Sequence, residues 1–211
     1  MKTILCYGDS NTYGYIPENG LRYPADVRWT GCLQNALGAE YRIIEEGCNG
    51  RTTVHDDPID GWKNGISYLM PCLYSHKPVD IIILMLGSND MKVNFNATAD
   101  DAANGVARII DIMKSFTLDR QGYVPQIILV SPPVISEAVL KGPFVGTFDE
   151  KSVSESRRFS SCYRNVADEK ACIFADAAMV IEPSEVDGLH LSADSHSKLA
   201  DALSKIIKSL E

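Results

Sequence analysis

The alternation of short apolar runs with longer stretches of helical period is the feature that most constrains this fold. The runs are rich in Ile, Leu and Val with little polar alternation, and they cover residues 3–6, 41–44, 79–86, 126–130 and 172–175. Continuous apolar strands of this kind are typical of a parallel sheet that is covered on both faces. With helices between the strands, the pattern predicts an α/β fold built from right-handed βαβ units.

Four stretches place apolar residues on one face of a helix, and they lie at residues 29–37, 66–73, 106–113 and 199–210. The last has the clearest boundary, because Ser192 suits an N-cap and Asp194 suits the first turn. These stretches predict the helices that cover the sheet.

The chain has 211 residues, which favours one domain when a domain averages about 150 residues. We find no repeat or linker and expect a single domain over residues 1–211. The longest irregular stretch is an excursion at about 132–150 that carries several apolar residues. They could line a pocket, meet another subunit or fold back on the core, and the sequence does not decide between these.

The charge balance argues against two classes of partner. Twenty Lys and Arg residues stand against 28 Asp and Glu residues, for a net charge of −8. Nucleic acids and anionic membrane surfaces attract basic proteins, so we expect neither as a partner. No apolar stretch reaches the length of a membrane span, and the first apolar run is too short for a secretion signal, which predicts a cytoplasmic protein.

The six cysteines lie mostly within apolar runs, where a free thiol behaves as a small buried hydrophobe. We therefore expect structural thiols rather than disulfides. The chain has no Cys-x-x-Cys pair and no zinc-finger spacing of Cys and His, so we expect no metal and no organic cofactor.

Polar, glycine-containing segments follow three of the predicted strands and precede the last helix, at residues 8–12, 47–53, 87–90 and 187–190. Ligands of open α/β sheets bind outside the carboxyl ends of the strands. We therefore expect the four segments to gather at one edge of the sheet and to form the functional site.

The residue types in these segments suit acyl transfer. Ser10 follows a glycine at a sharp turn between strand and helix, which is where a nucleophilic hydroxyl can stand clear of the backbone. His190 can act as its base, and Asp187 lies three residues upstream, where one turn could hold the imidazole in the required tautomer. The Ser10 backbone N–H, the Gly50 backbone N–H and the Asn89 side-chain amide can supply an oxyanion hole.

These four segments resemble the four conserved blocks of the SGNH hydrolases, a superfamily also known as GDSL-like esterases and lipases. The blocks occur in the family order and span nearly the whole chain. The resemblance implies a three-layer α/β/α sandwich around a five-stranded parallel sheet in flavodoxin-like order. It also implies Ser10 as nucleophile, His190 as base, Asp187 as its partner, and Ser10, Gly50 and Asn89 as the oxyanion hole.

Further runs are similar to the bacterial arylesterase and acetyl-esterase branch, including residues 28–29, 45–47, 49–53, 56–58 and 85–92. This likeness implies hydrolysis of short-chain acyl esters and a homo-oligomer. Asn11 and Tyr13 depart from the branch, which usually has an apolar residue and Trp at these positions. With Arg51 they are our candidate pocket residues, and the acyl and alcohol preferences stay open.

Three alternatives remain. A flavodoxin-like binding module for a nucleotide or FMN would use the hydroxyl-rich loop after the first strand, but it leaves Asp187, His190 and Asn89 unexplained. An ordinary α/β-hydrolase wants G-x-S-x-G, which is absent around Ser10. A third alternative keeps the SGNH chemistry and changes the substrate to an acetylated sugar or a thioester.

Other polar residues receive structural readings. We expect Asp9 to brace the turn before Ser10 and Asp90 to hold its own loop. His196 falls inside the last predicted helix, His55 lies at the edge of the pocket, and His76 lies near a helix end.

Overall fold

The computed structural model describes residues 1–210 and contains one five-stranded sheet in which every adjacent pair of strands is parallel. The strands are β1 (Lys2–Gly8), β2 (Tyr41–Gly47), β3 (Ile81–Met85), β4 (Gln126–Ser131) and β5 (Ile173–Asp176). Each overlaps one of the five apolar runs. The strand order is β2-β1-β3-β4-β5, which is the flavodoxin-like order, so the predicted fold class is confirmed.

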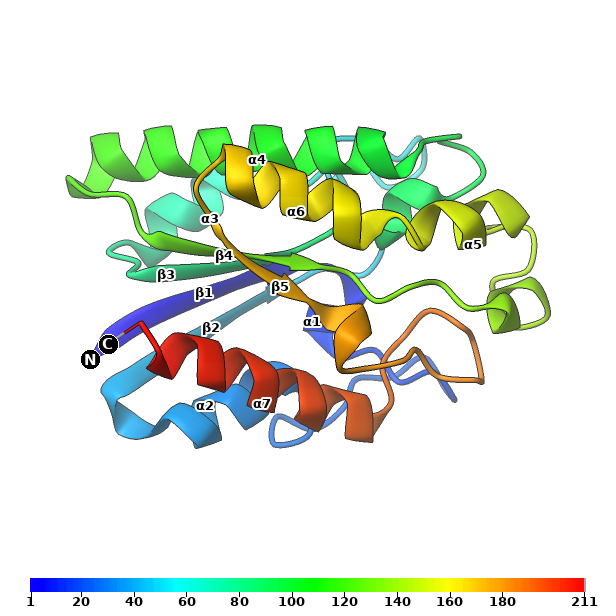
Figure 1. The fold of residues 1–211 in the computed structure, drawn as a ribbon, viewed down its shortest axis with the longest axis horizontal. Coiled ribbons are helices and arrows are strands. Elements are labelled where there is room, and N and C mark those ends of the chain that lie inside the picture. Colours follow the sequence, from blue (N-terminus) through cyan, green and yellow to red (C-terminus); the bar gives the residue numbers. More distant parts are fainter. Residues whose placement is uncertain (211) are drawn as a thin grey trace.

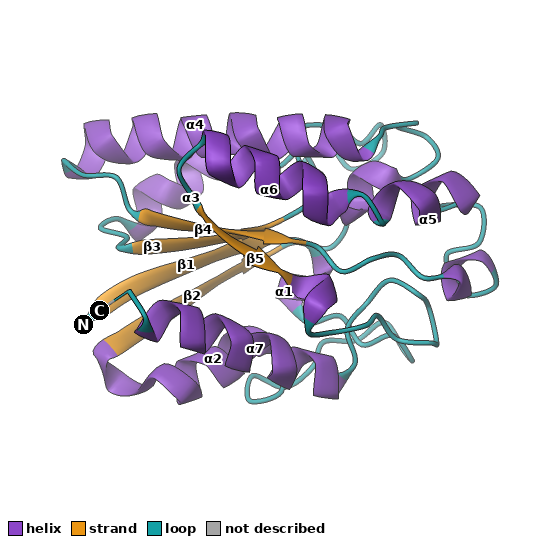
Figure 2. Cartoon of the chain, in the orientation of Figure 1, coloured by secondary structure: helices purple, strands orange, loops and turns teal. Residues whose placement is uncertain are grey.

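Helices cover both faces of the sheet (Figures 1 and 2). The helices are α1 (Ser10–Tyr13), α2 (Trp29–Leu37), α3 (Leu69–His76), α4 (Ala99–Gln121), α5 (Glu150–Ser156), α6 (Phe159–Glu169) and α7 (Ala193–Lys208). Short 3-10 helices lie at η1 (Gly38–Glu40), η2 (Ser88–Met91), η3 (Glu137–Leu140) and η4 (Ala177–Met179). In Figure 1, α3, α4 and α6 lie above the sheet and α2 and α7 lie below it.

The central strand β3 is apolar at every position because its successive side chains enter two different cores. In β3, Ile82 and Leu84 pack with residues of α3, α4 and α6, whereas Ile81 and Ile83 pack with residues of α2 and α7. A polar side chain at any of these positions would be buried without water. The absence of polar alternation in the sequence is therefore a direct consequence of the three layers.

Two helices, α5 and α6, lie in a part of the chain for which we predicted no helix. The buried face of α6 is formed by Phe159, Cys162, Tyr163, Val166 and Ala167. Their spacing of three and four residues was available in the sequence as a helical signal. At the other end of the chain, the Ser192 side chain caps α7 by accepting from the Ser195 N–H, as predicted.

The irregular excursion after β4 folds back onto the molecule. Ile135, Val139 and Phe148 are buried in the core beneath α4 and α6, while Val145 is 66% exposed. The short helix η3 lies within the excursion. Folding back on the core therefore accounts for most, but not all, of its apolar residues.

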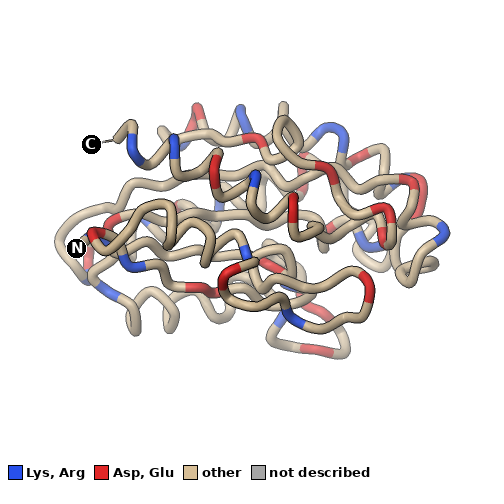
Figure 3. Tube along the Cα trace, turned by 90° about the horizontal axis from the view of Figure 1, so that it is seen from below, with Lys and Arg blue, Asp and Glu red and all other residues tan. Residues whose placement is uncertain are grey.

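Charged residues of both signs are interspersed over the face drawn in Figure 3. All six cysteines are free thiols, in agreement with the reading of the sequence. Within residues 1–210, no helix is long and apolar enough to cross a membrane.

Candidate active site at the carboxyl edge of the sheet

Ser10 stands where β1 ends and turns into the short helix α1. The turn is tight because Gly8 has no side chain: a Cβ there would lie 2.1 Å from Thr12 Oγ1 and 2.8 Å from the Met85 carbonyl oxygen. The Asp9 carboxylate caps α1 by accepting from the Asn11 N–H at 2.9 Å. Ser10 is the first residue of this helix, so its N–H has no acceptor within the helix and can serve a ligand.

The structure joins Ser10, His190 and Asp187 in a chain of hydrogen bonds. Ser10 Oγ lies 2.8 Å from His190 Nε2, and His190 Nδ1 lies 2.7 Å from Asp187 Oδ2. An ionised carboxylate can only accept, so the proton of the ring lies on Nδ1 and leaves Nε2 to accept from the serine hydroxyl. This is the tautomer that a general base needs.

Asp187 is held in its ionised form by its surroundings. Burial opposes ionisation, but hydrogen bonds from the His190 ring and from the His190 and Leu189 N–H groups outweigh it and lower the pKa of Asp187. Oδ1 accepts the two backbone N–H groups at 2.9 and 3.0 Å, which leaves Oδ2 for the imidazole. The loop that carries the pair is thus organised by the same carboxylate.

Asn11 ties this loop to the nucleophile turn. Its amide donates to the Leu189 carbonyl oxygen at 3.3 Å and accepts from the Leu191 N–H at 3.1 Å. Residues 180 positions apart are therefore fixed relative to each other by one side chain. Asn11 therefore helps to position His190 and does not line the pocket.

The three residues expected to form an oxyanion hole lie around one cavity. Ser10, Gly50 and Asn89 line the same cavity, and Gly50 has a φ of 78°, a left-handed conformation that favours glycine. The Asn89 amide donates to the Arg51 carbonyl oxygen at 3.2 Å and contacts Asp9 Oδ2 at 3.4 Å. The Arg51 carbonyl oxygen takes one of the two amide N–H groups. The second has only the long contact with Asp9, so it is the one that can turn to a ligand.

The cavity beside Ser10 has a volume of about 220 Å³. Its lining consists of Ser10, Tyr15, Asn49, Gly50, Asn89, Lys92, Phe144, Thr147, Phe148, Leu189 and His190. The lining combines aromatic and aliphatic side chains with polar ones. A site of this size and chemistry can receive a small acyl group whose carbonyl oxygen faces the donors.

Comparisons with known proteins show the family. The model of the GDSL-like lipase/acylhydrolase family matches residues 6–198. The chain belongs to that family. Like other members of this acylhydrolase family it is a carboxylic ester hydrolase, and a flavodoxin-like binding module is not favoured.

Solved structures place this acylhydrolase among bacterial esterases. Est24, a carbohydrate acetylesterase from Sinorhizobium meliloti, is 36% identical with a TM-score of 0.94, and the alignment covers 100% of both chains. The aryl esterase of M. smegmatis is also 36% identical, with a TM-score of 0.93 and 100% of both chains covered. A lipase/acylhydrolase from Enterococcus faecalis shares the fold at 19% identity, with a TM-score of 0.71 over 99% of this chain and 96% of its own. No curated protein sequence gives a significant match.

The three side chains proposed from sequence as pocket residues lie outside the lining of this acylhydrolase's cavity. Asn11 points into the loop of His190, as described above. The guanidinium of Arg22 lies over the Tyr13 ring, with Arg22 Cζ 4.4 Å from the ring centroid. Arg51 donates to the carbonyl oxygens of Gly8 and Glu46 and stacks on Tyr7, so it holds the loop after β2 in place.

Tyr15, Phe144 and Phe148 line the cavity of the acylhydrolase. Lining a pocket was one of the roles left open for the excursion that carries Phe144 and Phe148, whereas Tyr15 was missed. The Tyr15 ring is stacked on the His190 imidazole with centroids 4.1 Å apart, and Phe144 lies 5.4 Å from the same imidazole. The apolar character of the excursion was the sequence signal for the two phenylalanines, because large apolar side chains are uncommon in a solvent-exposed loop. Nothing local in the sequence connected Tyr15 to His190.

Two carboxylates are buried beneath the donors. Burial raises the pKa of Asp9 and of Asp90 to about 6, against the hydrogen bonds that favour their ionised forms. Asp90 accepts from the Thr53 N–H and hydroxyl, which joins the loop after β2 to the loop after β3. Asp9 braces the turn before Ser10, as expected, whereas Asp90, expected to hold its own loop, binds Thr53 of the loop after β2.

The other histidines lie apart from the Ser10 hydroxyl. His196 accepts from the Trp29 N–H, and burial lowers its pKa to about 4. His55 stacks on Phe95 with centroids 5.0 Å apart. His76 belongs to a group of metal-ligand side chains that lies outside the cavity and is described below.

Proposed function

We propose that this protein is a serine esterase that hydrolyses short-chain, acetyl-type esters of aromatic alcohols or carbohydrates through an acyl-enzyme. The observation that carries the proposal is the hydrogen-bond chain from Ser10 Oγ through the His190 imidazole to Asp187. The cavity beside Ser10 supports the acyl preference, because about 220 Å³ suits a small acyl group.

In the proposed mechanism, Ser10 Oγ attacks the ester carbonyl while His190 Nε2 takes the hydroxyl proton. Asp187 stabilises the imidazolium that forms, and the proton then passes to the leaving alkoxide. Water repeats the sequence on the acyl-enzyme and regenerates the Ser10 hydroxyl. The step consumes one water and yields a carboxylic acid and an alcohol.

Negative charge develops on the carbonyl oxygen in both tetrahedral intermediates. We assign its stabilisation to the N–H groups of Ser10 and Gly50 and to the Asn89 amide. Donors that are fixed in advance stabilise the transition state without reorganising during the reaction, which makes this arrangement effective.

The deciding experiment is hydrolysis of p-nitrophenyl acetate by the wild type and by Ser10→Ala. Loss of the nucleophile in a serine triad lowers kcat by about 10⁴- to 10⁶-fold, and Ser161→Ala, on an exposed part of α6, should leave the rate unchanged. An inactive wild type would reject the esterase, and an active Ser10→Ala would reject the nucleophile. Mass spectrometry after reaction with a sulfonyl fluoride should locate the adduct on Ser10.

The alcohol can be assigned with a panel of acetyl esters. Phenyl acetate, an acetylated monosaccharide and an acetyl thioester share the acyl group and differ only in the leaving group. The ratio of their kcat/KM values identifies the leaving group that the site selects, since KM and kcat together report transition-state binding.

We also propose that the chain forms one domain and assembles as a homo-oligomer. Strands from along the whole chain enter a single sheet, which supports one domain. Ile59 and Trp62 are 88% and 64% exposed, and large exposed apolar side chains favour a partner surface. Light scattering after size-exclusion chromatography tests the assembly, and a monodisperse monomer would reject it.

We further propose that the protein is cytoplasmic. Its six free thiols fit the reducing environment of that compartment.

A further inference from the structure

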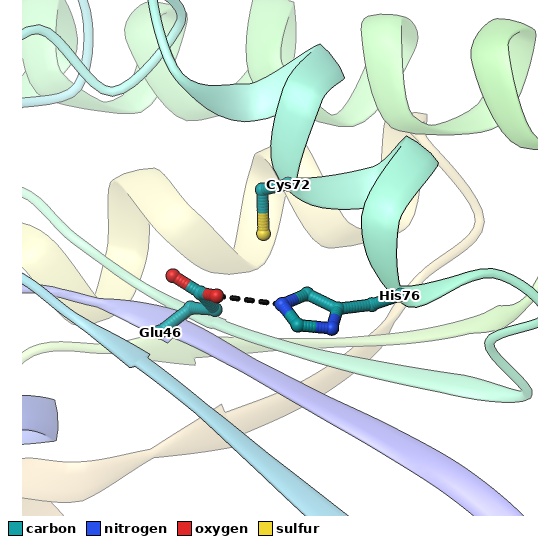
Figure 4. A group of neighbouring side chains, drawn as sticks. All are labelled: Glu46, Cys72 and His76. Carbon is teal, nitrogen blue, oxygen red and sulfur yellow. Dashed lines mark hydrogen bonds and ion pairs between the residues drawn. The ribbon is translucent and has the colours of Figure 1, made fainter.

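A second group of reactive side chains lies between β2 and α3, and it shares no residue with the lining of the esterase cavity. Cys72 and His76 are four residues apart on α3, so their side chains lie on one face of the helix. Glu46 reaches the same space from β2. Figure 4 shows the Cys72 sulfur directed toward the Glu46 carboxylate and the His76 ring.

The distances within this group are short. Glu46 Oε1 lies 2.7 Å from His76 Nε2, and the three potential ligand atoms all lie within 4.8 Å of one another. Zinc binds thiolate sulfur at about 2.3 Å and imidazole nitrogen or carboxylate oxygen at about 2.0–2.2 Å. In a tetrahedron these lengths place the ligand atoms roughly 3.3–3.6 Å apart, so Glu46 Oε1 and His76 Nε2, now 2.7 Å apart, would have to separate to admit the ion. Glu46 and His76 are 18% and 25% exposed, so their side chains have room to rotate toward an ion.

Charge balance at the proposed site depends on the Cys72 thiol losing its proton. An incoming ion would replace the Sγ proton, which leaves to solvent, and the resulting thiolate and the Glu46 carboxylate would together balance its charge.

We propose that Glu46, Cys72 and His76 bind one zinc ion through a thiolate, an imidazole and a carboxylate. Sulfur and nitrogen ligands favour zinc over magnesium or calcium, which prefer oxygen ligands alone. Three protein ligands leave a fourth tetrahedral position, and the partial exposure of Glu46 and His76 gives water access to it.

The simpler reading is that Glu46 and His76 form an ion pair over a thiol that only fills space. The two readings differ in what happens to the Cys72 sulfur, because only metal binding makes it a ligand. The expectation of no metal rested on the absence of zinc-finger spacing, which takes no account of the pair Cys72 and His76. Glu46 lies 26 residues before Cys72, and only the packing of α3 against the sheet brings it near.

Cobalt(II) is the probe of choice because it takes the place of zinc and reports on its ligands by absorption. After removal of metal with a chelator, titration of the full-length protein should give a thiolate-to-cobalt charge-transfer band and intense tetrahedral d–d bands, saturating at one equivalent. Zinc should abolish these bands at one equivalent. A wild type without the charge-transfer band would overturn the proposal.

Variants then identify the ligands. Cys72→Ser should remove the charge-transfer band, and His76→Gln should weaken cobalt affinity by at least about 100-fold, since loss of even an outer-shell partner costs 10- to 100-fold. His76 is partly exposed, so its variant stays informative if the buried Cys72→Ser folds poorly. Cys172→Ser removes a partly buried thiol elsewhere and should bind as the wild type does. An unchanged spectrum in either ligand variant would reject the site.

Discussion

The Tyr15 ring lies against the His190 imidazole, with the two planes inclined by 30° and the ring centroids 4.1 Å apart. In the proposed mechanism this imidazole becomes an imidazolium each time Ser10 is deprotonated. An aromatic face stabilises an adjacent cation by about 0.5–2 kcal/mol. Tyr15 therefore favours the charged form of the base at the moment when it is needed.

Replacement of Tyr15 should separate this electrostatic effect from simple packing. Tyr15→Leu keeps an apolar side chain without a π face, and we expect kcat/KM to fall by about 2- to 30-fold, which is the same energy expressed as a rate. Tyr15→Phe keeps the ring and should restore kcat/KM to the wild-type value. A kcat/KM in Tyr15→Leu equal to that of the wild type would show that the stack only packs.

Removal of the Asn89 amide should lower kcat far more than it raises KM. We expect Asn89→Ala to lose about 10²- to 10³-fold in kcat, the typical effect of one oxyanion-hole donor, because the amide stabilises charge that is present only in the transition state. Steady-state kinetics on p-nitrophenyl acetate measure the split. Asn94→Ala, an exposed asparagine nearby in the chain, is the matched control. A loss confined to KM would contradict the assignment.

Asp9 should make stability depend on pH with an unusual sign. Its pKa is about 6 when folded and 3.8 ordinarily, so between about pH 4 and 6 the folded state holds a proton that the unfolded state has lost. The free energy of unfolding therefore falls as pH rises through this window, by roughly 3 kcal/mol. Asp9→Asn removes this contribution, and its stability relative to the wild type should rise by that amount from pH 4 to pH 7.

Urea unfolding at several pH values tests the Asp9 prediction, and parallel curves for the two proteins would refute it. Asp57→Asn serves as a control of opposite sign, because hydrogen bonds from the Asp60 and Ile59 N–H groups lower the pKa of Asp57. Asp9→Asn should also lose activity at pH 7. The new amide presents a donor where Asn89 Nδ2 now has a carboxylate oxygen 3.4 Å away, so the Asn89 amide would turn.

Phe144 should limit the length of the acyl group. Phe144→Ala enlarges the cavity beside His190, and the ratio of kcat/KM for p-nitrophenyl hexanoate over acetate should rise at least about tenfold, since even one methylene in an apolar pocket is worth 10-fold or more. Val145→Ala, which changes a side chain that is 66% exposed, should leave the ratio as it is. A constant ratio in Phe144→Ala would place the acyl group elsewhere.

The sequence by itself determined the layers and the edge of the sheet where the functional residues meet. A strand covered on both faces is apolar over its buried positions, so β1 and β3 could be recognised from runs of apolar residues. Parallel strands end at one edge, so Ser10, Asn89 and His190 were expected together before their distances were known. These inferences work because each signal lies within a short stretch of sequence. The family blocks also occur in the expected order along the chain.

Only the tertiary structure decided which side chains surround Ser10 and which lie together elsewhere. The stack of Tyr15 on His190, the return of Phe144 to the cavity, and the approach of Glu46 to Cys72 join residues whose sequence neighbourhoods carry no sign of each other. Arg51 was expected in the pocket and instead donates to the carbonyl oxygens of Gly8 and Glu46. Such pairings depend on how helices and loops pack against the sheet. The local sequence pattern is compatible with several packing arrangements, and side-chain shape and the need to satisfy buried hydrogen-bonding groups determine which one forms.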